Sequence, residues 1–346
     1  MSDTFNKIVK KMGLPRLIIT TFFIIVWILV FVKQLPAASL FSDSVRRFGM
    51  NGILVLAMVP AIHCGIGPNF ALPIGIICGI LGGLVSIQVG AGGIGGFLLA
   101  IAIAVPISIL VGWLYGIMLN KIKGSEMLVA TYTGFAFVSL MSIAWILLPF
   151  TSSEMKWPIG DGLRVTIALE STFGYILDNF LRIEIGNLKI PTGMLLFFAL
   201  TCWVMWIFSK SKAGIAMKAS GDNPKFALAS GINVDNYRIL GTIISTSLGA
   251  VGYIVYAQSY GFIQLYQAPL MMAFPAVAAI LIGGATAKTA SISHVVIGAF
   301  LFNGLLAISL PVASSFFNGG NISEVFRMIV QNGIILYALT QVGGGE

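Results

Sequence analysis

The sequence predicts an all-α, polytopic membrane protein, and three observations support this fold class. Of the 346 residues, 58% are hydrophobic and only 9% are charged, whereas about a quarter of the residues of a soluble protein are charged. The apolar residues form long continuous runs, and about 20 such residues cross roughly 30 Å of hydrocarbon as a helix. Strands of a membrane barrel would show about ten residues of alternating polarity. The long uninterrupted runs therefore favour helices.

Ten apolar runs predict about ten membrane-spanning helices in a single domain of residues 1–346. The expected spans are 16–34, 50–64, 70–88, 94–119, 126–149, 191–209, 239–259, 268–284, 293–311 and 325–341. The first is expected to be retained, because no small-residue cleavage site follows it as in a signal peptide. No internal repeat is visible, although ten spans can accommodate two halves of diverged sequence.

The basic residues predict the orientation of the chain. The net charge is +8, and the lysines and arginines lie in the loops between the expected spans, as in other membrane proteins. The charge therefore does not indicate nucleic-acid binding. With the N-terminus inside, every inner loop that carries charge is net basic, whereas the outer loop of residues 150–190 balances its basic residues with acidic ones. We expect both termini to lie inside.

Two polar segments on the outer side are expected to have structure of their own. The loop of residues 150–190 is too long for a simple linker and is expected to contain one or two short helices. Residues 39–52, SLFSDSVRRFGMNG, precede the second expected span. Their composition is typical of an interfacial amphipathic segment, with Arg46 and Arg47 at the level of the lipid headgroups.

The segment from Lys210 to Arg238 is the longest polar interruption on the inner side, and it contains a short helix with its own start and stop. Asn223 is suited to cap the helix, Pro224 to occupy its first position, and Gly231 to end it in the left-handed conformation. We expect this helix at Pro224 to Ser230. A helix of two turns is not stable alone in water, so another surface must receive it.

Familiar catalytic and nucleotide-binding motifs are missing or incomplete. Gly90, Gly92 and Gly95 match G-x-G-x-x-G, but a membrane helix precedes them and no acid follows at the required distance, so they indicate a tight turn. No phosphate-binding G-x-x-x-x-G-K-[ST] occurs, and the two histidines, His63 and His294, belong to no metal motif. The chain is therefore not expected to be an enzyme.

The candidate substrate path lies in the segment of residues 63–75, HCGIGPNFALPIG, with two prolines and three glycines. Broken backbone at membrane depth often marks a substrate site, although an ordinary turn is the alternative. The path candidates are His63, Asn69, Phe70 and Asn303. The alternative is that such uncharged polar residues bond neighbouring helices. Tyrosines and glutamines at residues 253–267 indicate an interfacial aromatic belt or the mouth of the path.

The cysteines show no ligand spacing. Cys64, Cys78 and Cys202 fall in or beside apolar runs, where a free cysteine behaves as a small buried hydrophobe. We predict no metal site.

Residues 211–239, SKAGIAMKASGDNPKFALASGINVDNYRI, resemble the cytoplasmic loop of permease subunits of bacterial ABC importers. The family carries ribose, galactose and other simple sugars, with nucleoside and branched-chain amino acid permeases as relatives. The matching residues are Gly214, Ala219, Gly221, Asn223, Ala227, Ser230 to Val234 and Arg238. Residues 51–66, 276–285, 295–305 and 326–339 resemble other spans of the same family, so the resemblance covers roughly residues 48–339.

The resemblance implies that this loop carries a coupling helix, which docks in a groove of a separate ATPase subunit. The residues implied are Gly221, Asp222, Asn223, Pro224, Lys225, Phe226, Ala227, Leu228, Ser230 and Gly231. ATP and magnesium would be held by that ATPase, and no cofactor by this chain. The other implied partners are an external solute-binding protein and a second permease copy or paralogue, in a bacterial cytoplasmic membrane.

The implied solute is small and polar, with a simple sugar as the first expectation and a nucleoside or branched-chain amino acid as alternatives. An ion-coupled secondary carrier is the alternative from another class, but the paucity of intramembrane carboxylates disfavours it. Two departures weaken the sugar assignment. The family's Asp-Leu-Ser-x-Gly after Gly65-Ile66 is replaced by Gly67-Pro68-Asn69-Phe70, and its second glycine cluster is replaced by Thr286 to Thr289.

Overall fold

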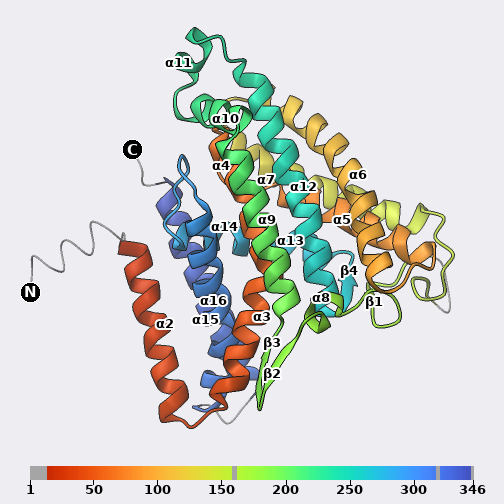
Figure 1. Cartoon of the computed structure of the whole chain (residues 1–346), viewed down its shortest axis with the longest axis vertical. Coiled ribbons are helices and arrows are strands. Elements are labelled where there is room, and N and C mark those ends of the chain that lie inside the picture. The colour runs from red at the N-terminus through yellow and green to blue at the C-terminus, as the bar shows by residue number, and fades with distance from the viewer. Residues whose placement is uncertain (1–13, 158–161, 317–319, 344–346) are drawn as a thin grey trace, which may run out of the picture.

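The computed structural model describes residues 14–157, 162–316 and 320–343, and over these ranges the chain is a bundle of helices with a few three-residue strands (Figure 1). The first six helices are α2 (Leu14–Val32), α3 (Ala37–Leu56), α4 (Met58–His63), α5 (Leu72–Gln88), α6 (Gly93–Lys121) and α7 (Glu126–Leu147). The later helices are α9 (Thr192–Lys210), α10 (Lys212–Asp222), α11 (Pro224–Ala229), α12 (Val234–Tyr260), α13 (Gln267–Met271), α14 (Ala273–Ile282), α15 (Ile292–Ser314) and α16 (Gly320–Gly343).

The helix lengths confirm a helical, polytopic membrane fold. Within the described ranges, seven helical segments are long and apolar enough to cross a membrane. They are Ala37–His63, Gly93–Lys121, Glu126–Leu147, Thr192–Lys210, Val234–Tyr260, Ile292–Ser314 and Ile322–Thr340. Three shorter apolar helices, Arg16–Val32, Leu72–Gln88 and Gln267–Ile282, lie at the remaining expected positions.

The second span begins earlier than expected. Residues 39–52 are not a separate interfacial segment but belong to α3, and α3 and α4 together form the candidate span Ala37–His63. The prediction of a separate segment was wrong, because Arg46 and Arg47 lie within one continuous helix and do not interrupt it. Leu40, Ser44 and Val45 are buried in this part of α3, and Arg46 is paired with Asp178.

The described residues of the outer loop expected at 150–190 form one short helix and three short strands. These are β1 (Thr166–Ala168), α8 (Ile176–Asn179), β2 (Ile183–Ile185) and β3 (Leu188–Ile190). β2 and β3 form a hairpin, and β1 pairs antiparallel with β4 (Phe262–Gln264), with Ile167 opposite Ile263. The loop is thereby attached to the chain just after α12.

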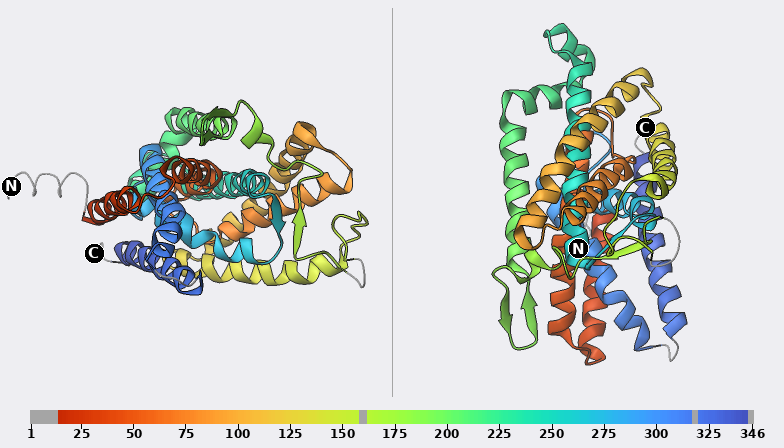
Figure 2. Two further views of the ribbon diagram at one scale, coloured as in Figure 1. Left: turned by 90° about the horizontal axis from the view of Figure 1, so that it is seen from below. Right: turned by 90° about the vertical axis from the view of Figure 1, so that its right-hand side faces the viewer.

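Helix α12 occupies the centre of the bundle. It packs most extensively against α6, α5 and α3, while α3 also packs against α15. Seen along the bundle, α9 lies on one side of α12, and α7 and α16 lie on the other (Figure 2). The α10–α11 segment lies at one end of the molecule and the β2–β3 hairpin at the other (Figure 1).

Glycines allow the backbones of neighbouring helices to approach closely. A Cβ on Gly75 of α5 would lie 2.5 Å from the carbonyl oxygen of Thr246 in α12. A Cβ on Gly298 of α15 would overlap the backbone of Ala279 in α14. Small residues at such contacts are the usual way in which membrane helices pack.

Gly298→Ala is expected to destabilise the protein by about 1–3 kcal/mol, because the added methyl group meets backbone and forces α14 and α15 apart. The free energy of unfolding in detergent micelles measures this loss. Gly95→Ala is the matched control, since nothing lies within 4 Å of that position on α6, and it should be neutral or stabilise by up to about 1 kcal/mol. Equal effects of the two substitutions would contradict the role assigned to Gly298.

Candidate functional site

The short helix expected after residue 223 is present as α11 (Pro224–Ala229). The Asn223 side chain caps it by accepting a hydrogen bond from the backbone N–H of Phe226, at 3.1 Å. Pro224 occupies the first turn, and Gly231 has a φ of +79° just beyond the helix. The predicted capping is confirmed. Gly221 and Asp222, however, lie in the last turn of α10, so the expected coupling segment is divided between two helices.

Helix α11 presents apolar side chains that nothing in the described chain covers. Ala227 is fully buried against the rest of the loop, whereas Phe226 is 64% and Leu228 is 61% exposed. The helix lies at the tip of the molecule (Figure 1). An exposed apolar pair at the tip of a capped two-turn helix is typical of a contact with another protein.

The preceding helix connects this tip to the turn between α4 and α5. Gly221 packs directly on the backbone of His63 and Gly65, so closely that a Cβ on Gly221 would overlap that backbone. His63 in turn lies with its Nε2 atom 2.9 Å from the carbonyl oxygen of Ala290 in the loop before α15. The end of α10 therefore contacts the turn of residues 63–65, and through His63 this contact extends to the loop before α15.

An ion pair joins the start of α12 to the start of α7. The Arg238 guanidinium lies 2.6 Å from a carboxylate oxygen of Glu126, and its Nε donates to Asn120 Oδ1 at 3.0 Å. The two charged side chains are only 9% and 14% exposed. Sequence reasoning missed this pair because the partners are 112 residues apart, and no local pattern relates them.

Three of the predicted path residues make contacts between or within the helices. Asn69 donates to Ser245 Oγ at 2.8 Å and accepts from the backbone N–H of Ala71 at 3.0 Å. Phe70 packs against Phe274, with 5.9 Å between the ring centroids. His63 likewise contacts the carbonyl oxygen of Ala290. These contacts fit the alternative to a substrate path, in which uncharged polar residues bond neighbouring helices.

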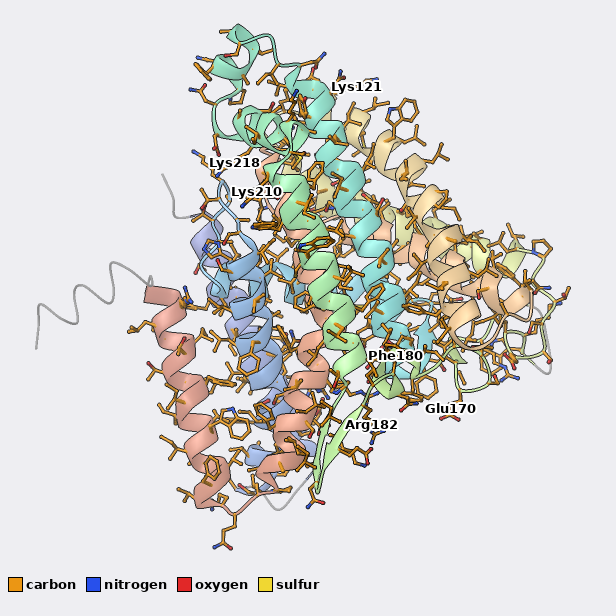
Figure 3. The ribbon with its side chains drawn as sticks, viewed as in Figure 1. Lys121, Glu170, Phe180, Arg182, Lys210 and Lys218 are labelled. Atoms are coloured by element: carbon orange, nitrogen blue, oxygen red, sulfur yellow. The ribbon has the colours of Figure 1, made fainter. Side chains whose placement is uncertain are left out.

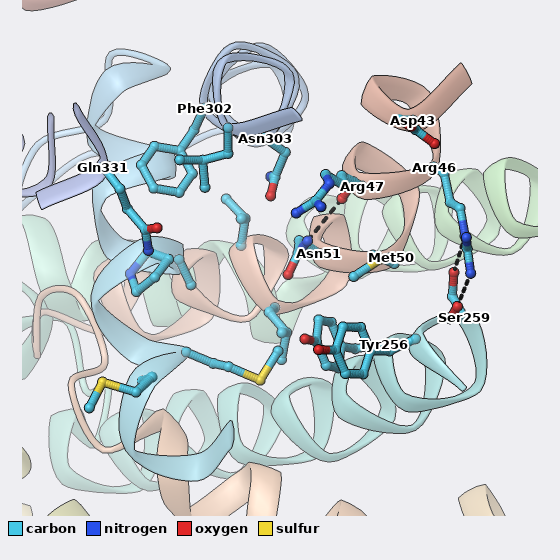
Figure 4. A pocket seen from close by; sticks show the side chains of 18 of the residues that line it. Asp43, Arg46, Arg47, Met50, Asn51, Tyr256, Ser259, Phe302, Asn303 and Gln331 are labelled. Atoms are coloured by element: carbon cyan, nitrogen blue, oxygen red, sulfur yellow. Dashed lines mark hydrogen bonds between the residues drawn. The ribbon is translucent and has the colours of Figure 1, made fainter. Parts of the chain in front are cut away.

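The fourth path residue, Asn303, lines a cavity of about 460 Å³. The cavity lies between α3, α12, the α13–α14 segment, α15 and α16 (Figure 4). His63, Asn69 and Phe70 are not among the residues that line it. The polar residues of its wall are Asp43, Arg46, Arg47, Asn51, Tyr175, Tyr256, Ser259, Tyr260, Asn303, Arg327 and Gln331.

Two of the three arginines in the cavity wall are paired. Arg46 lies 3.0 Å from a carboxylate oxygen of the buried Asp178, which also accepts hydrogen bonds from Ser259 and Gln258. Arg327 donates to Glu324 at 2.9 Å and to Gln331 Oε1 at 3.0 Å. Arg47 makes no side-chain hydrogen bond or ion pair with any described residue.

The free guanidinium in the cavity was missed by sequence reasoning. The sequence did contain a signal for it. Arg46 and Arg47 are followed by 16 residues of mostly apolar sequence up to His63, and a charge inside a span is by default a functional candidate.

Within the described ranges, no group of three or more histidine, cysteine, aspartate or glutamate residues is placed to hold a metal ion.

Replacing Arg238 tests the ion pair at the start of α12. Arg238→Leu is expected to destabilise the protein by about 3–5 kcal/mol, because it leaves the largely buried Glu126 carboxylate without its cation. The double change Arg238→Leu with Glu126→Leu should recover most of the loss, as measured by unfolding in micelles. Lys123→Gln, which breaks the exposed pair with Asp235, should cost less than about 1 kcal/mol. A double variant as unstable as Arg238→Leu would contradict this account.

The chain has recognisable relatives among known proteins. Over 309 residues it is 21% identical to the autoinducer 2 import system permease protein LsrC of Photorhabdus luminescens, covering 86% of this chain and 84% of the relative. It is 29% identical over 127 residues to LsrC of Photorhabdus laumondii, covering 35% of this chain and 38% of the relative.

A nucleoside permease is similar over a shorter region. The chain is 32% identical over 78 residues to the nucleoside ABC transporter permease protein NupC of Lactococcus lactis, which is 22% of this chain and only 24% of that relative. No solved structure matches the chain.

A family model covers most of the chain. It is described as the branched-chain amino acid transport system / permease component, and it matches residues 40–339. This range includes the capped helix α11, the Arg238–Glu126 pair and the cavity. The match also confirms the resemblance found at residues 48–339. The chain therefore belongs to this family of ABC transporter permeases and is a multi-pass membrane protein.

Proposed function

We propose that this chain is the transmembrane subunit of an ATP-driven importer in a bacterial cytoplasmic membrane, and that it translocates a small polar solute. The observation that carries the proposal is α11, a capped helix at the tip of the bundle with Phe226 and Leu228 exposed. The chain supplies the path, and a separate ATPase subunit supplies ATP, magnesium and hydrolysis.

The α11 helix is the docking element for the ATPase. Its two exposed apolar side chains enter a groove of the partner, while the buried Ala227 anchors the helix to its own loop. The cap from Asn223 and the left-handed Gly231 hold the helix in shape before docking. Binding therefore costs little ordering entropy.

Movement at α11 reaches the cavity through α12. The short connection from Ser230 to Asn233 leads directly into α12, whose 27 residues extend about 40 Å. Arg238 near its first end is held by Glu126, while Ser259 and Tyr260 at its last end line the cavity. A tilt of α12 at one end therefore displaces the cavity wall at the other.

The α11 end is the cytoplasmic end in this proposal. Lys121, Lys210 and Lys218 lie at that end, whereas Glu170, Phe180 and Arg182 lie at the opposite end (Figure 3). Basic residues favour the cytoplasmic side. The opposite end, with α8 and the β2–β3 hairpin, receives the solute from an external binding protein.

The apolar sides of α7 and α16 support insertion in lipid and pairing with a second permease. In the most apolar 18-residue stretch of each of these helices, only 17% of the residues are buried within the chain. The second permease is a copy of this chain or a paralogue, and the solute passes between the two.

The relatives support a small polar organic solute. Two carry names that refer to import of autoinducer 2 and one to nucleosides. We keep a simple sugar as the first reference compound, with nucleosides and branched-chain amino acids as the alternatives to be compared with it.

Phe226→Asp is expected to abolish recovery of the permease with its ATPase, because a charge replaces the exposed ring that enters the partner's groove. Affinity purification of the tagged permease from its native membrane, followed by an ATP-hydrolysis assay of the eluate, measures the association. Phe180→Asp is the matched control, since Phe180 is also half exposed but lies at the opposite end. Undiminished recovery with Phe226→Asp, or solute uptake that is independent of ATP, would instead favour an ion-coupled carrier.

Cysteine labelling tests the orientation. The three native cysteines are buried, so a cysteine introduced in their presence reports its own accessibility to a charged maleimide. Lys225→Cys in α11 should react only after the membrane is permeabilised, whereas Lys189→Cys in the β2–β3 hairpin should react in intact spheroplasts. The reverse pattern would place α11 outside and refute the docking role.

A further inference from the structure

We propose that the cavity between α3, α12, α15 and α16 selects a solute with an anionic group, a carboxylate or phosphate, attached to a hydroxylated ring. Arg47 is the residue that binds the anionic group. This inference rests on the proposed import function and specifies the class of solute. It differs from the neutral sugar expected from the sequence.

Two charged side chains of the cavity wall, those of Arg47 and Asp43, have no ion-pair partner among the described residues. Arg46 is neutralised by Asp178, and Arg327 is neutralised by Glu324. Arg47 has no such partner among the described residues and points into the cavity (Figure 4). A charge within a membrane span is costly unless a partner or water compensates it. Arg47 is exposed to the cavity, where water solvates its guanidinium until the anionic group of a solute takes the place of that water.

The opposite charge nearest along the helix is that of Asp43, which lies four residues before Arg47 on α3. Asp43 lines both this cavity and the neighbouring hollow formed with α8 and the β2–β3 hairpin. No ion pair joins Asp43 to Arg47 in the described part of the chain, although residues four apart on a helix are neighbours. Its place at the boundary of the two hollows suits contact with hydroxyl groups, for which a carboxylate is an acceptor.

The amide side chains of the wall are arranged to receive hydroxyl groups. Asn51 donates its NH₂ group to the carbonyl oxygen of Arg47 at 3.0 Å, and Asn303 donates to the carbonyl oxygen of Ala299 at 2.8 Å. Each amide oxygen therefore remains available as an acceptor. In Gln331 the roles are reversed. Its amide oxygen accepts a hydrogen bond from Arg327, so its NH₂ group remains available as a donor.

A flat aromatic surface on α12 completes the wall. The rings of Tyr256 and Tyr260 are stacked, with centroids 5.3 Å apart and an interplanar angle of 16°. Both tyrosines line the cavity. A stacked pair of rings offers a broad apolar face with polar edges, which fits the face of a sugar-like ring whose hydroxyls point to Asn51 and Asn303.

A neutral solute is expected to bind weakly in this cavity. It would displace water from Arg47 without supplying a charged acceptor, and an unsatisfied ionic group costs more than an unsatisfied neutral one. An anionic solute replaces that water with a charge-assisted, bidentate hydrogen bond. The difference between the two solutes is the basis of the selectivity.

The test compares matched anionic and neutral probes. Full-length permease in lipid nanodiscs is titrated with glucuronate and ribose 5-phosphate, and with glucose and ribose, while its thermal unfolding midpoint is followed. At least one anionic probe is expected to raise the midpoint, and its neutral counterpart to have little effect. Arg47→Gln should weaken binding of that anion by about tenfold or more, and Arg47→Lys should weaken it less.

A control variant separates local recognition from general charge. Arg164→Gln removes an arginine in the loop before β1, outside the cavity, and should leave anion binding unchanged. The proposal is overturned if neither anion binds, if neutral probes bind equally well, or if Arg47→Gln and Arg164→Gln have the same effect. Recovery of the ATPase with the same permease assesses the import function independently of these outcomes.

Discussion

Polar groups inside an apolar helix bundle must be satisfied within the protein, and the arrangement of this molecule follows from that requirement. Asn69 is bonded to Ser245, which is bonded in turn to the carbonyl oxygen of Ala57. Arg238 is paired with Glu126, and Asp178 is paired with Arg46. Each of these bonds crosses between elements far apart in the chain, so the same bonds that remove the cost of burial also align the helices.

Helix α12 joins the end near α11 to the cavity, and most of these bonds converge on it. Its first turns hold Arg238, its middle holds Ser245, and its last turns hold Ser259 and Tyr260. Glycines at contacts with α5 and α6 bring the backbones close together, so that the helix is positioned by rigid backbone and not by flexible side chains. A helix of this kind transmits a displacement over its whole length, whereas a bundle with loose side-chain contacts would absorb it.

The local features of the loop at residues 210–238 could be predicted because their causes are local. Asn223, Pro224 and Gly231 act within three or four residues of one another, and the structure has the helix they predict. The start of the second span could not be predicted in the same way. Arg46 lies within that span because its partner, Asp178, is supplied by a segment 132 residues later. The composition of residues 39–52 does not indicate that partner.

The sequence by itself determined the helical membrane fold, the family and the capped helix α11, because these depend on composition, on the length of apolar runs and on hydrogen bonds between near neighbours. Only the tertiary structure decided which polar residues are paired and which face a cavity. Asn69 and Asn303 are the same residue type in similar apolar surroundings, yet one bonds a neighbouring helix and the other lines the cavity. The physical reason is that pairing depends on where distant helices place their donors and acceptors, and that placement is a property of the whole bundle.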